Sequence, residues 1–269
     1  ISKEKFELKK CVSCDFVFTS NPPSETAAGP YYKSEDYISH SNTSKDLISK
    51  LYKIARGFML GIKERLVKQY ASGKKVLDYG AGTGFFMNHL KELNYKVSGV
   101  EIDPQAREFG IDNFGLEVGS PEDLFTNTKK GHYDAITLWH VLEHLYDPVK
   151  YLKKFHSLLH QDGALFLALP NLESYDAKYF KDKWAAYDVP RHLWHFSRTA
   201  IDSLFSQHGM KVVATRPMVF DAFYVSLLSE KYRTGKQNFL KAFFVGCLSN
   251  LSGWLTKEHS SIIYILQKD

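Results

Sequence analysis

The feature that most constrains this chain is an apolar run that ends in an acidic residue and leads into three closely spaced glycines. The run ends at Asp78, and Gly80, Gly82 and Gly84 follow it. From Met87 onward, apolar residues recur at the spacing of one helix face. This order predicts a strand, a tight loop and a helix N-terminus, where a doubly wound α/β sheet receives a nucleotide-like ligand. Glycine suits such a loop because it adopts positive φ and leaves bare backbone for a ligand.

The glycine spacing separates two kinds of nucleotide-binding loop. A dinucleotide-binding loop reads G-x-G-x-x-G, and its third glycine lets the helix pack closely on the strand. Here Phe85 stands five positions after the first glycine, which argues against a pyrophosphate ligand. The pattern Asp-x-Gly-x-Gly-x-Gly instead resembles motif I of the class I S-adenosylmethionine-dependent methyltransferases.

This resemblance implies S-adenosylmethionine as the cofactor and a Rossmann-like α/β fold with a doubly wound, seven-stranded, mostly parallel sheet. The cofactor is then expected to contact the glycine loop and the ends of the strands that follow it. The expected cofactor-binding residues are Asp78, Gly80, Ala81, Gly82, Gly84, Glu101, Ile102, Ser120, Glu122, Trp139 and His140.

Glu101 ends the next predicted strand, about twenty positions after the first glycine, where such folds place an acidic residue on the ribose hydroxyls. An ionised carboxylate offers two acceptors to the two donors of a vicinal diol. Asp103 with Pro104 is expected only to open the following helix. By resemblance, the loop after the third strand contacts the adenine. Ser120 replaces the acidic residue common there, so this contact can pass to Glu122, Asp123 or a backbone amide.

The segment after the fourth predicted strand contains Leu142-Glu143-His144. It resembles methyltransferases related to the quinone-biosynthesis O-methyltransferases. The resemblance runs from Val76 to Phe196 and returns at the C-terminal strand. The segment also satisfies H-x-x-E-H, the inverted zinc-protease signature. Zinc needs both histidines on one helix face and a third protein ligand. Because His140 directly follows a strand, we expect the two histidines to straddle a loop-to-helix transition, and we predict no metal.

Transfer of a methyl group to a hydroxyl usually needs a base that takes the hydroxyl proton. The segment after the fifth strand supplies His192 and His195, and His140 lies at the rim of the predicted site. These three histidines are the candidate catalytic residues, because histidine titrates near neutral pH. The alternative is a structural role, in which each histidine satisfies a backbone carbonyl.

Charge and cysteine content restrict the partners and the compartment. The 269 residues carry a net charge of +5 without a dense Lys/Arg run, so nucleic acid is not expected as a partner. Three cysteines cannot form a disulfide framework, which favours a reducing cytoplasm. No signal peptide is visible, although Ile1 is no natural initiator.

Cys11 and Cys14 have the spacing of half a four-thiolate zinc site. The segment through Pro23 resembles the second knuckle of small zinc-binding modules that precede some methyltransferase domains. Only Cys247 remains elsewhere, so a metal-free remnant or an incidental pair is expected.

Helix-capping residues, glycines and changes in composition along the chain predict its organisation. We expect a polar, loop-like extension over residues 1–42 and a methyltransferase core over 43–219, with a cap at 171–196. A helical insertion over 220–256 and the last strand over 257–269 complete the chain. Thr43 and Asp46 resemble a capping box that opens helices covering the sheet edge. Asp147 and Gly163 are expected to bound the helix after the fourth strand, and Ala164 to begin the fifth strand.

The insertion carries two apolar stripes at helical spacing. A lid or a homodimer helix is expected, with shallow membrane contact as an alternative; the stripe is too short to span a bilayer. The predicted function is methylation of a small molecule, sugar-containing or lipid-like, at an oxygen atom. The alternatives are a cofactor-binding protein without catalysis and a methyltransferase acting on RNA or protein.

Overall fold

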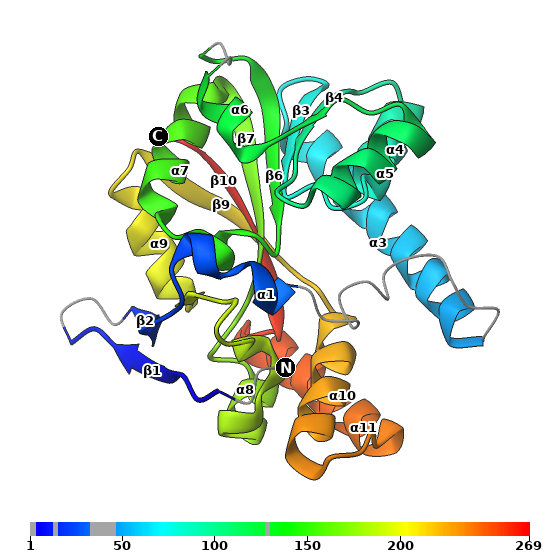
Figure 1. Cartoon of the computed structure of the whole chain (residues 1–269), viewed down its shortest axis with the longest axis vertical. Helices are drawn as coiled ribbons and strands as arrows, with labels where there is room; N and C mark the ends of the chain where they lie inside the picture. The colour runs from blue at the N-terminus through cyan, green and yellow to red at the C-terminus, as the bar shows by residue number, and fades with distance from the viewer. Residues whose placement is uncertain (1–3, 13–15, 33–46, 127–129) are drawn as a thin grey trace.

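A seven-stranded sheet forms the centre of the protein (Figure 1). The computed structural model describes residues 4–12, 16–32, 47–126 and 130–269. The strand order is β5-β4-β3-β6-β7-β10-β9, and only β10 runs antiparallel to its neighbours. The strands are β3 (Lys75–Tyr79), β4 (Lys96–Val100), β5 (Val118–Gly119), β6 (Tyr133–Trp139), β7 (Leu159–Pro170), β9 (Met210–Pro217) and β10 (Ser261–Lys268). The predicted seven-stranded, mostly parallel sheet is therefore confirmed.

Helices cover both faces of this sheet, and the side chains of β7 show how. Leu165, Leu167 and Leu169 join one core, with α6 (Pro121–Thr126), α7 (Pro148–Leu158) and α9 (Arg198–Ser206). Ala164, Phe166 and Ala168 join the other, with α3 (Leu47–Tyr70) and α4 (Phe85–Glu92). Successive residues of a strand face opposite sides, so a central strand covered on both faces is apolar throughout. α5 (Pro104–Phe114) connects β4 to β5.

Two elements differ from the expected organisation. α7 ends at Leu158 rather than near Gly163. The backbone adopts an extended conformation at Leu159 and continues as β7. Gly163 lies inside this strand, where an added Cβ would meet Leu159 Cδ1 at 2.9 Å and Asp134 O at 3.0 Å. The apolar run at 158–159 is buried and extends the strand beyond the glycine.

The N-terminal segment is the second difference, because it is not simply loop-like. β1 (Glu7–Lys10) and β2 (Val17–Ser20) form a hairpin, and β2 pairs with β8 (Trp194–His195). Phe16 and Phe18 pack against Trp194, and these aromatic contacts hold β2 beside β8. η1 (Glu25–Ala27) and α1 (Gly29–Tyr32) follow. Cys14, Thr43 and Asp46 lie outside the described residues.

The remaining helices form a separate layer at the lower end of the molecule in Figure 1. They are α8 (Tyr175–Phe180), η3 (Lys181–Lys183), η4 (Ala185–Tyr187), α10 (Asp221–Thr234) and α11 (Phe239–Thr256), with η2 (Leu142–His144) at the sheet edge. The buried carboxylate of Asp176 accepts hydrogen bonds from Trp184, Ser249 and Ser260 at 2.6–2.8 Å. This one side chain therefore ties α11 and the start of β10 to α8. None of the described helices has the length and apolarity to cross a bilayer.

Candidate active site

The glycine loop joins β3 to α4 at the carboxyl end of the sheet. Gly80, Gly82 and Gly84 have φ values of 80°, 53° and 80°, which favour glycine. A side chain at Gly80 would collide with Val141, and a Cβ at Gly84 would lie 2.5 Å from Leu116 Cδ1. Around Gly82, by contrast, no described atom lies within 4 Å of an added Cβ. The outer two glycines thus permit packing, and the middle one leaves backbone open to a ligand.

Glu101 stands at the end of β4, directly beside this open backbone. Its Oε2 accepts a hydrogen bond from Gly82 N at 2.7 Å, and its Oε1 accepts one from Asp103 N at 2.9 Å. The side chain is buried, yet each carboxylate oxygen keeps a second acceptor position. The next residue, Ile102, is 70% exposed and can cover one side of a bound ring. Asp103 caps α5 by accepting from Gln105 N, as expected.

Asp78 lies beneath the loop among groups that the sequence does not place together. It accepts a 2.6 Å hydrogen bond from Thr137 Oγ1 on β6. Burial raises the pKa of the Asp78 carboxyl to about 7, although the Thr137 hydroxyl and the charge of Lys63 oppose the shift. Burial likewise lowers the pKa of Lys63 to about 8, against the attraction of Asp78 and Asp221. Both groups therefore titrate within two units of neutral pH.

Trp139 ends β6 on the same side of the sheet. Its Nε1–H is buried and has no hydrogen-bond partner among the described residues. Lys63 Nζ lies 4.2 Å from the Trp139 ring centroid, within range of a cation–π contact. The open backbone at Gly82, the Glu101 carboxylate and this unused indole donor together fit a ligand with an adenosine moiety.

The loop after β5 holds the two residues expected near the adenine. Ser120 donates to Asp123 Oδ2 through its backbone N at 2.7 Å and its Oγ at 3.1 Å. The Asp123 carboxylate therefore accepts its hydrogen bonds from within the loop. Ser120 also lowers the pKa of the neighbouring carboxyl of Glu122, which is exposed and ionised at neutral pH. Adenine contacts by Ser120 or Glu122 remain predictions.

Comparison with known proteins shows the family to which this chain belongs. A methyltransferase domain model matches residues 52–215, which is more than half of the chain. The chain belongs to the methyltransferase family. The model covers the glycine loop, Glu101 and the segment around His140, and it begins after the N-terminal cysteines. The resemblance of Cys11 and Cys14 to a zinc knuckle therefore stays a prediction.

Curated relatives of this chain include ubiquinone biosynthesis O-methyltransferases. The one from Haemophilus ducreyi is 29% identical over 110 residues, or 37% of this chain and 46% of its own. One from Xanthomonas oryzae is 32% identical over 107 residues, or 37% of this chain and 44% of its own. The chain thus matches less than half of the length of these relatives.

Solved structures share the fold of this chain. Magnesium protoporphyrin IX methyltransferase from Synechocystis, with bound SAH, superposes with a TM-score of 0.59 at 12% identity, covering 91% of this chain and all of its own. A SAM-dependent methyltransferase from Archaeoglobus fulgidus gives 0.54 at 16% identity, covering 83% of this chain and all of its own. These two likenesses, at 16% identity or less, are likenesses of fold.

His140 follows β6 directly and adopts a positive φ of 59°. Its Nε2 lies 3.1 Å from Asp221 Oδ2 at the start of α10, and its Nδ1 lies 3.4 Å from Glu143 Oε1. Burial acts to lower the pKa of His140, but the two carboxylates outweigh it and raise the pKa to about 10. His140 is therefore an imidazolium at neutral pH, a state that does not suit a proton acceptor.

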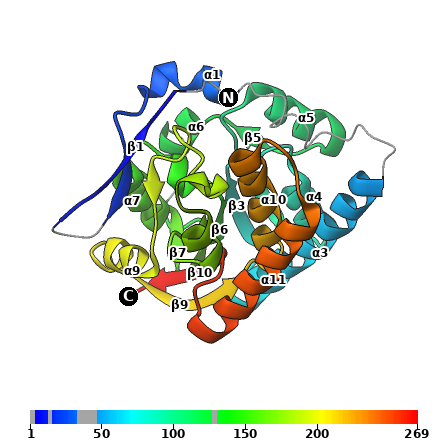
Figure 2. The same ribbon diagram turned by 90° about the horizontal axis from the view of Figure 1, so that it is seen from below.

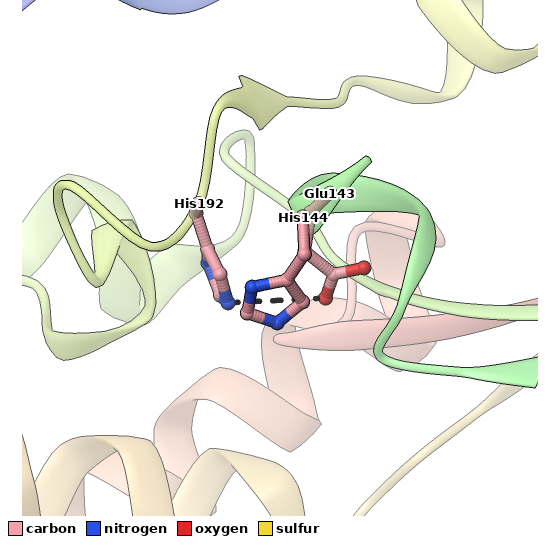
Figure 3. A group of neighbouring side chains, drawn as sticks. All are labelled: Glu143, His144 and His192. Carbon is pink, nitrogen blue, oxygen red and sulfur yellow. Dashed lines mark ion pairs between the residues drawn. The ribbon is translucent and has the colours of Figure 1, made fainter. Parts of the chain in front are cut away.

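Glu143, His144 and His192 form a group of neighbouring side chains, as Figure 3 shows. Glu143 and His144 come from η2, and His192 comes from the loop before β8. Their potential ligand atoms all lie within 4.8 Å of one another, and His192 Nε2 is 4.0 Å from Glu143 Oε1. Glu143 is buried, and neither of its carboxylate oxygens has a hydrogen-bond partner among the residues that the structure describes.

Backbone carbonyls fix the orientation of both imidazoles. His192 Nδ1 lies 2.8 Å from Ala186 O, and His144 Nδ1 lies 3.0 Å from Arg191 O. A carbonyl only accepts, so both Nδ1 atoms carry hydrogen, and in its neutral form each ring has its lone pair on Nε2. Burial and the neighbouring His192 lower the pKa of His144 to about 4, so His144 is neutral.

His195 faces the N-terminal hairpin rather than this group. Thr19 Oγ1 donates to His192 O at 2.6 Å and lies 3.0 Å from His195 Nε2. Because the single Thr19 proton goes to the carbonyl, His195 Nε2 must donate to Thr19. Burial lowers the pKa of His195 to about 3, and repulsion from His192, when that ring is protonated, acts in the same direction. These contacts give His195 a role in holding β2 against β8.

The H-x-x-E-H spacing does not create a helix-borne histidine pair. His140 lies in the left-handed region after a strand, whereas His144 lies in a single 3-10 turn. The two histidines thus straddle a loop-to-helix transition, as the sequence predicts. The group with ligand spacing instead pairs Glu143 and His144 with His192, which lies far along the chain.

Three site residues escape sequence reasoning: Lys63, Thr137 and Asp221. Lys63 has a detectable signal, because it shares a helix face with Leu66 and Val67, both buried. A cation within an apolar stripe points to a buried partner. Thr137 lies within an apolar strand, and Asp221 opens an amphipathic helix; neither position carries a distinguishing pattern.

Proposed function

We propose that this chain transfers the methyl group of S-adenosylmethionine to a hydroxyl oxygen of a small-molecule acceptor, with His192 as the general base. The observation that carries the proposal is the His192 imidazole, fixed by Ala186 O with its Nε2 turned toward carboxylates. Glu143 Oε1 lies 4.0 Å and Asp188 Oδ2 3.7 Å from that atom. The curated relatives named for ubiquinone O-methylation support oxygen as the acceptor atom.

The chain's own residues would hold the cofactor as follows. Glu101 would accept hydrogen bonds from the ribose hydroxyls, and the Gly82 backbone would lie against the nucleoside. Trp139 Nε1 would donate to an acceptor atom of the ligand. When bound, S-adenosylmethionine supplies an electrophilic methyl carbon on a positively charged sulfur. Asp78 would orient the loop from beneath through its hydrogen bond with Thr137.

His192 has the proton-transfer role in this mechanism. Transfer would form a bond between the acceptor oxygen and the methyl carbon and break the sulfur–carbon bond, whose electron pair would stay on the sulfur. The hydroxyl proton moves to His192 Nε2. The carboxylates of Glu143 and Asp188 then stabilise the imidazolium, and His140 balances the charge on Glu143 at 3.4 Å. His195 has no step in this scheme, because its Nε2 donates to Thr19.

Methyl transfer from labelled donor to a panel of phenols, sugars and lipid alcohols tests the proposal. His192→Asn keeps a donor for Ala186 O but removes the base, so turnover with the best acceptor should fall about 100-fold or more. Cofactor affinity should not change. His208→Asn is the matched control, because His208 also donates Nδ1–H to a backbone carbonyl, that of Leu204 at 2.9 Å. Equal turnover in the two variants would remove His192 from the mechanism. Labelling confined to RNA or protein would exclude a small-molecule acceptor.

A further inference from the structure

α11 presents its large apolar side chains outward and its small and polar ones inward. The buried face consists of Ala242, Val245, Gly246, Ser249, Asn250 and Gly253. The outward face consists of Leu240, Phe243, Phe244, Cys247, Leu251, Trp254 and Leu255. Leu240 is 85%, Leu255 80% and Trp254 61% exposed. This is the reverse of the pattern by which a helix of a globular protein buries its apolar stripe.

Specific contacts hold α11 in this orientation, so it cannot roll to bury its apolar face. Ser249 Oγ donates to the buried Asp176 carboxylate at 2.6 Å, and Asn250 Nδ2 donates to Val219 O at 2.9 Å. A Cβ at Gly246 would lie 2.5 Å from Phe223 Cδ1, and one at Gly253 would collide with His259. At these two positions only glycine fits, against Phe223 of α10 and against His259 just before β10. The outward direction of the large side chains is therefore built into the packing.

Basic residues predominate around this helix, between Glu230 and Glu258. Residues 231–257 contain no Asp or Glu and carry five basic residues, at positions 231, 233, 236, 241 and 257. Lys236 and Lys257 are exposed and flank the two ends of α11. Arg233 and Lys241 lie beside the buried Glu230 on α10. At 1.5 Å per residue the 18 residues of α11 span about 27 Å, enough to present all of the outward residues in one line.

We propose that α11 binds in the headgroup region of an anionic lipid bilayer, with its axis along the membrane surface. Apolar side chains enter the acyl boundary, and flanking lysines attract anionic headgroups. A second copy of this chain is the less favoured occupant. A two-fold interface brings the same patch of both copies together, so the basic residues of each would oppose those of the other. Figure 2 shows α11 at the outer surface, side by side with α10.

Co-sedimentation with vesicles tests this proposal with the whole chain. Wild-type protein should pellet with vesicles that contain phosphatidylglycerol, and less with phosphatidylcholine alone or at high salt. The triple variant Phe243→Ser, Leu251→Ser, Leu255→Ser should lose at least tenfold in vesicle affinity. The matched control changes exposed apolar residues on other surfaces, namely Leu93→Ser, Ile111→Ser and Val213→Ser, and should bind like wild type. Unchanged cofactor affinity in both triple variants establishes that each is folded.

Trp254 gives a second, local measurement. Its fluorescence should shift to shorter wavelength on vesicle binding, and Trp254→Phe should abolish that shift while preserving pelleting. Lys236→Glu with Lys257→Glu should weaken binding to anionic vesicles only. Failure of wild type to bind anionic vesicles would overturn the proposal. So would a dimer in light scattering that the first triple variant dissociates, because the face would then belong to a second copy.

Discussion

His140 Nε2 lies 3.1 Å from Asp221 Oδ2, and this contact joins the end of β6 to the first turn of α10, 81 positions away. It connects the segment that follows the central strand to the helical layer before the last strand. His140 has a raised pKa near 10 because this carboxylate and Glu143 stabilise its charged form. The ion pair therefore fixes both the protonation state of His140 and the position of α10 beside the site.

Asp221→Asn should reduce the free energy of unfolding by about 2 kcal/mol near pH 6.5, the usual range for a hydrogen bond to a charged group. The folded pKa of His140 exceeds its unfolded value of 6.5, so the stabilisation is full below pH 6.5. It declines as the pH rises above that value and is lost as the pH passes about 10. Wild type and variant should then converge in urea denaturation series at alkaline pH. Asp162→Asn removes an exposed His–Asp pair and should have little effect at any pH.

Glu101→Gln tests the predicted ribose contact. A glutamine would turn an NH₂ group toward either Gly82 N–H or Asp103 N–H, because both are donors. It would also lose one acceptor for the ribose. We expect calorimetry with S-adenosylmethionine to give a Kd weakened about 10- to 100-fold, the range for a hydrogen bond to a charged acceptor. Glu108→Gln on the exposed face of α5 is the control. A Kd equal to that of the control would show that Glu101 does not contact the ligand.

The glycine loop allows folding and binding to be separated. Gly82→Ala adds a methyl group where no described atom lies within 4 Å, so the protein should lose only about 1 kcal/mol of stability from the positive φ. Cofactor affinity should nevertheless fall, because the methyl occupies the surface on which the ligand lies. Gly80→Ala should instead lower the melting temperature strongly by collision with Val141. Normal cofactor affinity in Gly82→Ala would place the ligand elsewhere.

The features of this protein that could be predicted from the sequence are those set by residues close together along the chain. The glycines at 80, 82 and 84 have the positive φ that their spacing predicts, and Glu101 lies beside the loop. Each follows from a strand end, and the carboxyl ends of parallel strands meet at one edge. The seven-stranded sheet follows from the same alternation of elements.

The features that escaped prediction depend on long-range packing. Nothing local indicates that Asp221 meets His140 or that Thr19 meets His195, because these contacts join segments 81 and 176 positions apart. Gly163 resembles a helix stop, yet tertiary burial of Leu158 and Leu159 carries the strand past it. Periodicity locates the apolar stripe of α11 correctly. It cannot tell which face is inward, because that depends on Asp176 and Phe223 in other elements.

His195→Asn should leave turnover close to wild type, in contrast to His192→Asn, because an asparagine amide can still donate to Thr19 Oγ1. Its effect should appear in acid. The folded pKa of His195 is about 3 and its unfolded value is 6.5, so the unfolded state binds more protons between these values. Wild type therefore loses stability as the pH falls from 6.5 toward 3. His195→Asn should lose less over this window in urea denaturation, and an equal slope would contradict the burial of the neutral ring.

Zinc should inhibit methyl transfer by occupying the His192 lone pair. One ring nitrogen of His144, one of His192 and an oxygen of Glu143 lie within 4.8 Å of one another, so small side-chain rotations can bring all three to about 2.0–2.2 Å from one ion. Metal binding removes the proton-accepting atom that the proposed mechanism needs. Assays at neutral pH should show inhibition that a chelator reverses. Mg²⁺ should not inhibit at the same concentration, because it prefers oxygen ligands. His144→Asn removes one zinc ligand and keeps His192, so it should remain active and become less sensitive to zinc. Sensitivity equal to wild type would mean that the inhibiting ion binds outside this group.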